Sequence, residues 1–411
     1  MTSIASRESA VLWPTYVRAP VEFVRGEGTR LFDADGREYL DFLGGIAVVA
    51  AGHANPKVVA AVAGQLATLG HTSNLYFTGP QVDLAERLVD RFGGGAKVFF
   101  SNSGAEANEA AIKLARRYGR ATKGEQATGI VAAEGGFHGR TLGTLAATGK
   151  PAIKQAFEPL PAGFTHVPFG DADALAAAVN QTTAAVLLEP VQGEAGIRVP
   201  PDGYLAAARR IADDAGALLI LDEVQSGMGR TGTLFAHQRA GVRPDVMTLA
   251  KALGNGYPVG ATVAGDRAAA VLRPGDHAST FGGNPVACVA AMATLDVVEP
   301  LLDGGHVRRV SARLGDGLRA LAGRCRPAGQ VRGLGLWYAL DLGDAALQPG
   351  GGQQPAGAKA VAQAALAAGL VVNPVTDTAL RLAPPLVVSE EEVDEALARL
   401  ARALQEAGAC P

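Results

Sequence analysis

Lys251 and Asp222 are the residues whose positions most clearly allow chemistry. Asp222 follows the apolar run GALLIL, and Lys251 follows the apolar run VMTLA about one strand and helix further along. Ligands of open α/β sheets bind at the carboxyl ends of strands, so a carboxylate there is well placed for function. A lysine that ends a core strand is unusual, because burying its ammonium group costs free energy. Each also has an ordinary alternative: an acid that caps a helix or binds a metal, and a lysine that reaches solvent.

A third segment adds a possible phosphate site. The apolar run 97–100 is followed by the small polar residues Ser101 to Ala105, and then by a helical pattern. The first N–H groups of a helix are unpaired and attract anions, although ordinary connections in α/β proteins look the same. The segment matches neither the GxxxxGK[ST] nor the GxGxxG nucleotide pattern. A phosphate cradle, an acid and a buried lysine together are what pyridoxal phosphate requires.

The surrounding sequence predicts an α/β fold with a mostly parallel sheet. Alanine-rich helical stretches separate short β-rich runs, as in βα units. These runs cover residues 97–100, 129–133, 184–188, 217–221 and 245–249. Apolar residues from Ala107 to Tyr118 recur at helical spacing, and we place the end of that helix at Gly119, as a C′ glycine.

Changes of pattern divide the chain into three parts. We expect a large cofactor-binding domain over residues 61–298 and a smaller α+β domain over 299–411, with a strand at 335–342 and a solvated loop at 348–357. Its final helix begins at Ser389, which forms a capping box with Glu392. Residues 1–60, with the hairpin-like GTRLFDADGREYLDF, have too little core alone and should pack on the C-terminal part.

Composition excludes several classes of protein. The 411 residues are 48% apolar and carry a formal net charge of −3, so nucleic acid is not an expected partner. Charges at Arg7 and Glu8 interrupt any signal peptide, and the apolar run 286–295 is too short to span a bilayer. The three cysteines are far apart, and neither HExxH nor GxSxG occurs, so we expect no disulfide framework, metal site or serine hydrolase. A cytoplasmic location fits best.

Seven motifs in a fixed order are more specific than any of these features alone. They are SNSGAEANE, GGFHGRT, EPVQGEAG, LDEVQSGMGRTG, AKALGNG, STFGGNP and LRLAPPLVV. In this order and over nearly its whole length, the chain resembles the class III aminotransferases, most closely those that act on acetylornithine. The resemblance implies the fold type I of pyridoxal-phosphate transferases, in which a large domain with a mostly parallel sheet is joined to a smaller α+β domain.

The resemblance also implies roles around the cofactor. Lys251 would form the Schiff base and move the substrate proton, and Asp222 would keep the pyridine nitrogen protonated. The other implied contacts are the phosphate on Ser103, Gly104 and Ala105 and on Thr280 of a partner subunit, the ring against Phe137 and Val224, and the phenolic oxygen on Gln225. A shared site requires a homodimer. Phe137 could instead be an ordinary core residue.

Substrate recognition would depend on arginines. Arg140 and Arg381 could each grip a carboxylate with a bidentate fork, although surface arginines are common. In related enzymes the residue matching Glu194 covers the one matching Arg381 while an ω-amine is bound, and leaves it when glutamate binds. Tyr16 aligns with a tyrosine that holds the α-amino-acid end, or it is a packed tyrosine. Ile46 replaces a tyrosine of ornithine aminotransferases, which favours an N-acylated substrate.

These residues lead to an expected reaction. It converts N-acetylornithine and 2-oxoglutarate to N-acetylglutamate semialdehyde and glutamate, a step of arginine biosynthesis. Succinyl-diaminopimelate, ornithine, 4-aminobutyrate or a carrier-linked lysine remain alternative amine substrates. An aminomutase of the same fold would not need both Glu194 and Arg381, and a protein that only binds the cofactor would not need Lys251.

Overall fold

A seven-stranded sheet forms the centre of the molecule. The computed structural model describes residues 3–324, 329–343 and 357–409; the loop expected at 348–357 therefore lies outside them, except for Gly357. In spatial order the sheet contains β4 (Ala96–Ser101), β10 (Gly260–Gly265), β9 (Val246–Leu249), β8 (Leu218–Asp222), β7 (Thr183–Leu188), β5 (Gly129–Ala133) and β6 (Phe164–Val167). Only β10 runs antiparallel to its neighbours. The predicted α/β class with a mostly parallel sheet is confirmed.

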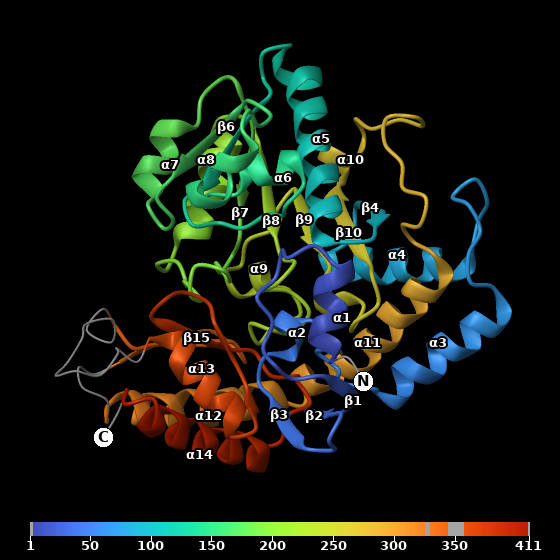
Figure 1. The fold of residues 1–411 in the computed structure, drawn as a ribbon. Coiled ribbons are helices and arrows are strands. Elements are labelled where there is room, and N and C mark those ends of the chain that lie inside the picture. The colour runs from blue at the N-terminus through green and yellow to red at the C-terminus, as the bar shows by residue number, and fades with distance from the viewer. Residues whose placement is uncertain (1–2, 325–328, 344–356, 410–411) are drawn as a thin grey trace.

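Helices cover both faces of this sheet because its strands are buried on both sides (Figure 1). α5 (Gly104–Lys123) packs against β7, β9 and β10 on one face, together with α10 (Asp266–Ala269). α7 (Ala172–Ala178) and α8 (Tyr204–Asp214) cover the other face, where the alternate residues of β7 and β8 point. Strands that are covered on both faces require unbroken runs of apolar residues, as in β7 and β8.

The predicted end of the helix at Gly119 is wrong. This glycine does not end a helix, because α5 continues to Lys123 and its C-cap is Gly124, which has φ of 103°. A Cβ atom at position 119 would lie 1.9 Å from the carbonyl oxygen of Ala127, so glycine is required there by close packing. The sequence pattern cannot distinguish a glycine that ends a helix from one that allows such a contact.

A second part of the molecule combines the N-terminal and C-terminal segments. One sheet has the order β1 (Phe23–Glu27), β2 (Arg30–Asp33), β3 (Glu38–Asp41) and β13 (Leu370–Val371), and the other β11 (Gln330–Gly333), β12 (Tyr338–Asp341), β15 (Ala379–Leu382) and β14 (Asn373–Pro374). The expected strand at 335–342 thus begins only at Tyr338. α12 (His306–Ala322), α13 (Ala358–Ala367) and α14 (Glu390–Glu406) pack on these sheets, at the bottom of Figure 1. The capping box of Ser389 and Glu392 is confirmed.

Three long helices form a third group beside the central sheet. α11 (Pro285–Asp303) packs against α3 (Pro56–Thr68) and α4 (Gly79–Phe92). Among the described residues α11 is the only helix long and apolar enough to cross a membrane, and half of its most apolar window is buried in the protein. Its buried residues contribute to the hydrophobic core, so it is a core helix.

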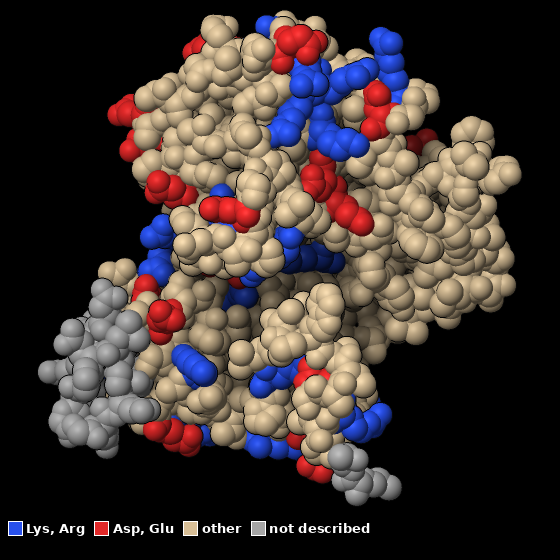
Figure 2. Space-filling view, turned by 45° about the horizontal axis from the view of Figure 1, so that its top comes forward, with Lys and Arg blue, Asp and Glu red and all other residues tan. Residues whose placement is uncertain are grey.

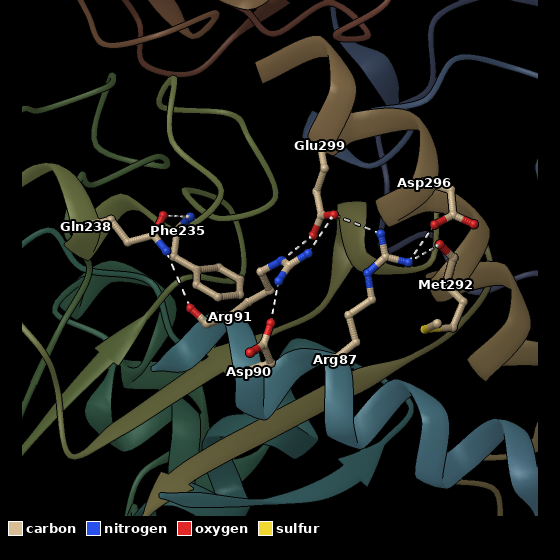
Figure 3. A network of polar contacts seen from close by, with 8 residues as sticks. All are labelled: Arg87, Asp90, Arg91, Phe235, Gln238, Met292, Asp296 and Glu299. Carbon is tan, nitrogen blue, oxygen red and sulfur yellow. Dashed lines mark hydrogen bonds and ion pairs between the residues drawn. The ribbon is translucent and has the colours of Figure 1, made fainter. Parts of the chain in front are cut away.

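Ion pairs hold α4 to α11 (Figure 3). The two terminal guanidinium nitrogens of Arg87 donate hydrogen bonds, Nη1 to Asp296 at 2.6 Å and Nη2 to Glu299 at 2.9 Å. Arg91 also donates to Glu299, at 2.8 Å and 3.2 Å. Burial opposes ionisation of Glu299, but the two arginines outweigh it and hold its pKa below the ordinary range.

The remaining helical segments are short. They are α1 (Ile4–Val11), α2 (Gly44–Ala47), α6 (Leu142–Ala147), α9 (Ala236–Arg239), α10 as given above, and the 3₁₀ turns Pro151–Ile153, Gln155–Phe157 and Lys251–Leu253. α1 has no buried residue, and the chain from Val11 to Pro20 is exposed throughout.

Candidate active site

Asp222 lies at the carboxyl end of β8, close to helix α5 and to the segment that follows β5. Its side chain is 4% exposed and accepts hydrogen bonds from Asn108 Nδ2, at 2.7 Å, and from the Val224 backbone N–H, at 3.0 Å. His138 Nδ1 lies 2.8 Å from the same carboxylate. Asn108 is itself fixed, since it accepts a bond from Thr248 and donates to the carbonyl of His138. The carboxylate therefore has a single, well-defined orientation.

Lys251 follows β9 and points into the same cavity. Its backbone has φ of 45°, in the left-handed region, which places it at the start of a tight 3₁₀ turn. Burial lowers the pKa of its amine to about 8, although the charges of Glu194 and Asp222 act in the opposite direction. A lysine that loses its proton near neutral pH can act as a nucleophile and as a base.

The cavity between these groups has a volume of about 400 Å³. It is lined by Ser103, Gly104, Ala105, Phe137, Arg140, Asp222, Val224, Gln225 and Lys251, together with Val48, Asn102, Asn108, His138, Gly139, Glu189, Ala250 and residues 256–259. Nine sequence-predicted site residues thus surround one space. Figure 2 shows a hollow across the middle of the molecule, with basic side chains in it.

The start of α5 forms one wall. Ser103 is its N-cap, and the Ser103 side chain accepts the N–H of Glu106. A Cβ atom on Gly104 would lie 2.7 Å from a methyl carbon of Val224, so only glycine allows this close contact. Unpaired N–H groups at the helix start suit a phosphate, the carboxylate suits a protonated pyridine nitrogen, and the lysine supplies an amine. The residues present therefore fit pyridoxal phosphate.

Glu189 is a site residue that the sequence analysis missed. It lies just after β7, is buried, and accepts the backbone N–H of Phe137 at 2.8 Å and that of Gly193 at 3.1 Å. Burial raises its pKa to about 7 in spite of these two donors. The rule that indicated Asp222, an acid at the end of a buried strand, applies equally to Glu189 and could have found it.

Arg381 and Glu194 form an ion pair at the edge of the cavity. Arg381 Nη1 lies 2.5 Å from Glu194 Oε1 and 3.0 Å from Gln225 Oε1, and its Nε donates to Asn373 at 3.1 Å. Arg381 is 1% exposed. Burial of Glu194 disfavours its charge, but Arg381 outweighs that effect and lowers the Glu194 pKa. Gln225, which lines the cavity, thus connects the cavity to this pair.

Two further predicted residues, Tyr16 and Thr280, lie outside this cavity. Tyr16 is 75% exposed in the N-terminal segment. Thr280 is exposed and lines a second cavity, of about 960 Å³, together with Asn74 and Ser279. Arg140 lines the first cavity, with its guanidinium carbon 5.7 Å from the centre of the Phe137 ring. Ile46 has φ of 68°, a strained conformation for a β-branched residue, and does not line the cavity.

Known proteins are similar to this chain in sequence and fold. The profile of the aminotransferase class-III family matches residues 14–404. Acetylornithine aminotransferase of Streptomyces coelicolor is 51% identical over 407 residues, which cover 98% of this chain and 96% of that protein. The enzyme of the same name from Mycobacterium bovis is 50% identical over 413 residues, with 100% and 98% covered.

A solved structure agrees with these matches. An ornithine aminotransferase from Toxoplasma gondii, reported with partial occupancy of pyridoxal phosphate at its active site, superposes with a TM-score of 0.90. It is 31% identical, and the match covers 98% of this chain and 94% of that one. The chain therefore belongs to the class-III aminotransferases and is a pyridoxal-phosphate-dependent transaminase.

Proposed function

We propose that this transaminase moves the δ-amino group of N-acetyl-L-ornithine to 2-oxoglutarate, giving N-acetyl-L-glutamate 5-semialdehyde and L-glutamate. The observation that carries the proposal is the ion pair of Arg381 with Glu194 beside Lys251. A transaminase for ordinary α-amino acids has no reason to cover its carboxylate-binding arginine. The names of the two bacterial relatives, which are about 50% identical to this chain, support the same substrate. The proposed pathway is arginine biosynthesis, in the cytoplasm.

Pyridoxal phosphate, when bound, supplies an electron sink for the carbon that carries the amine. Asp222 would hold a proton on the ring nitrogen, and its bonds from Asn108 and the Val224 N–H fix the carboxylate for that task. The N–H groups at Ser103 to Ala105 would hold the phosphate. Phe137 and Val224 would cover the ring faces, and Gln225 would bond the phenolic oxygen.

Lys251 would do the proton transfer. Its amine is buried, and the lowered pKa of about 8 leaves a useful neutral fraction near pH 7. After a substrate amine has displaced it, Lys251 Nζ would take the proton from the carbon that bears that amine. It would then deliver the proton on the cofactor's side of the amine nitrogen. The same atom thus serves as nucleophile and base.

The two substrates would place their carboxylates differently. With N-acetylornithine in the site, Arg140 would bind the α-carboxylate, while Glu194 neutralises Arg381. Glutamate brings its α-carboxylate close to the reacting carbon, where Arg381 must be uncovered to bind it. The ion pair would therefore act as a gate that admits two kinds of substrate to one site.

We also propose a homodimer with shared sites. Thr280 would reach the phosphate in the partner's cavity, and Tyr16 would help to hold substrate. Neither residue lines the cavity of its own subunit. Trp13, Leu75 and Phe77 are 85%, 86% and 101% exposed, an arrangement that favours burial against a second copy.

Half-reactions test the proposed substrate. Purified holoenzyme would be mixed separately with N-acetylornithine, ornithine, 4-aminobutyrate, succinyl-diaminopimelate and glutamate, without an acceptor, while the visible absorbance of the bound cofactor is followed. Bleaching by N-acetylornithine and glutamate, with a much slower response to ornithine, is the expected result. Faster bleaching by another ω-amine would replace the substrate, and a response to no ω-amine would contradict the proposed function.

A further inference from the structure

Lys150 lies directly behind the Glu194 gate. Its Nζ donates to the backbone carbonyl oxygen of Glu194 at 2.6 Å. The residue before it is firmly placed, since the carbonyl of Gly149 accepts the N–H of Gly135 and its N–H donates to Gly136. Lys150 is therefore anchored beside the loop that leads to Phe137 and Arg140.

The gate residue is held in two different ways. Its backbone is fixed, because Glu189 accepts the N–H of Gly193 and Lys150 bonds the Glu194 carbonyl. Its side chain reaches Arg381 at 2.5 Å and receives only a long bond from Gln225, at 3.3 Å. The side chain can therefore turn while the backbone stays in place.

A carboxylate that leaves Arg381 needs a new partner. Glu194 is largely buried, and an unpaired buried carboxylate is costly. A cation close to the Glu194 backbone would remove this cost.

We propose that Lys150 is this partner: when glutamate or 2-oxoglutarate occupies Arg381, the Glu194 carboxylate turns to the Lys150 ammonium. Because Nζ already contacts the carbonyl of the same residue, rotation about the Glu194 side-chain bonds is sufficient. The proposal rests on the proposed function, since it assigns the second position of that gate.

The charge of Lys150 supports this role. An ammonium group has three N–H donors, and one of them is used by the Glu194 carbonyl. Within the described residues, no carboxylate oxygen lies within 4.0 Å of this half-buried Nζ. Burial lowers the pKa of Lys150, and the charge of Glu194 is the strongest influence that opposes the shift. An arriving carboxylate would stabilise the ammonium form further.

The test compares the two half-reactions in matched variants. Lys150→Met removes the cation, Lys150→Arg keeps it, and Lys154→Met is the control. Lys154 is also half-buried with a lowered pKa, but it bonds the carbonyl of Ala146 instead of the gate. Holoenzymes would be mixed with glutamate or N-acetylornithine in single turnovers, and the apparent Kd and the rate would be read from the cofactor absorbance.

Lys150→Met should raise the apparent Kd for glutamate about tenfold, which corresponds to about 1.4 kcal/mol. The value for N-acetylornithine should change by less than about twofold, as should both values in Lys154→Met. Lys150→Arg should restore glutamate binding. In a Glu194→Ala background, Lys150→Met should have no further effect, because the carboxylate it receives is absent.

Several results would overturn the proposal. An equal effect of Lys150→Met on both amines would indicate a general structural role. An effect on glutamate that persists without Glu194 would mean that Lys150 contacts the substrate directly. If the wild type responds to another ω-amine, the proposed substrate fails while the glutamate comparison still tests Lys150. A wild type that does not respond to glutamate would overturn both.

Discussion

At the residue scale, the burial of Lys251 has a measurable consequence. Its pKa of about 8, lowered by burial, means that its amine is mostly neutral above that pH and mostly protonated below it. The rate at which cofactor-free enzyme takes up pyridoxal phosphate should therefore rise through pH 8 and then level off. An exposed lysine would give a rise that continues toward its ordinary pKa of about 10.4. Stopped-flow absorbance at a series of pH values measures this.

Replacement of Lys251 tests its proposed role directly. Lys251→Ala removes the amine that would transfer the proton, so turnover should fall by a factor of about 100 or more. Steady-state assays with N-acetylornithine and 2-oxoglutarate give the loss, and near-ultraviolet circular dichroism controls for folding. Turnover within a few-fold of wild type would exclude the lysine as the catalytic base.

Glu194 is proposed to determine the preference between the two amines. Glu194→Ala leaves Arg381 uncovered, so glutamate should compete better against N-acetylornithine, by about tenfold in the ratio of kcat/KM. Competition assays with both amines present measure that ratio. Glu194→Gln keeps a hydrogen-bond acceptor without the charge and should fall between the two enzymes. An unchanged ratio would remove the gate from the mechanism.

At the element scale, Glu299 connects α11 to α4 through Arg87 and Arg91. Its pKa is depressed in the folded protein, so its contribution to stability is present above the ordinary carboxylate pKa and is lost as pH falls through the lowered value. Glu299→Gln should cost about 1–3 kcal/mol of unfolding free energy at pH 7 and less at low pH. Chemical denaturation measures both.

A control variant compares the stability that Glu299 contributes with that of an ordinary exposed ion pair. Glu125 lies 3.7 Å from Arg120, and its side chain is 83% exposed. Glu125→Gln should change the unfolding free energy by less than about 0.5 kcal/mol. Equal losses in the two variants would show that the bonds in Figure 3 do not stabilise the helix pair.

Sequence patterns predicted the elements that carry the reactive groups. The strand before Asp222 and the capping box at Ser389 follow from local rules of periodicity and hydrogen bonding. β10 was not expected, since its sequence GATVAG begins and ends with glycine, which weakens a strand pattern. The extension of α5 beyond Gly119 depends on contact with a distant carbonyl, which a local pattern does not contain.

Site geometry could be predicted less fully. Motif order indicated residues that line the cavity, including Asp222, Phe137 and Lys251. Glu189, the first residue of the motif EPVQGEAG, was given no role, because its importance comes from two backbone N–H groups brought together by folding. The roles of the lining residues stay predictions, as do the limits of the three domains.

At the scale of the whole molecule, the proposed dimer can be tested by mixing subunits. Thr280→Asp would repel the phosphate in the partner's site, and Lys251→Ala disables the subunit's own site. Neither homodimer should be active. A mixed dimer would contain one site with both defects and one with neither, so purified mixed dimers should have about half of wild-type activity.

Co-expression with different tags, followed by purification through both, gives the mixed dimer. Ala278→Asp, at an exposed position two residues before Thr280, serves as the control for a new surface charge. No recovery in mixed dimers, or elution of the wild type as a monomer in size-exclusion chromatography, would contradict the shared site.

The position of Arg381 has an evolutionary consequence. It lies on β15 of the small antiparallel sheet, whereas Asp222 ends β8 of the central sheet and Lys251 follows β9. Under the proposed role of Arg381, mutations in the small sheet would change which acid the enzyme accepts without altering the reactive groups. In evolution, the small sheet can then change to suit new substrates. The central sheet, with Lys251 and Asp222, is inherited unchanged.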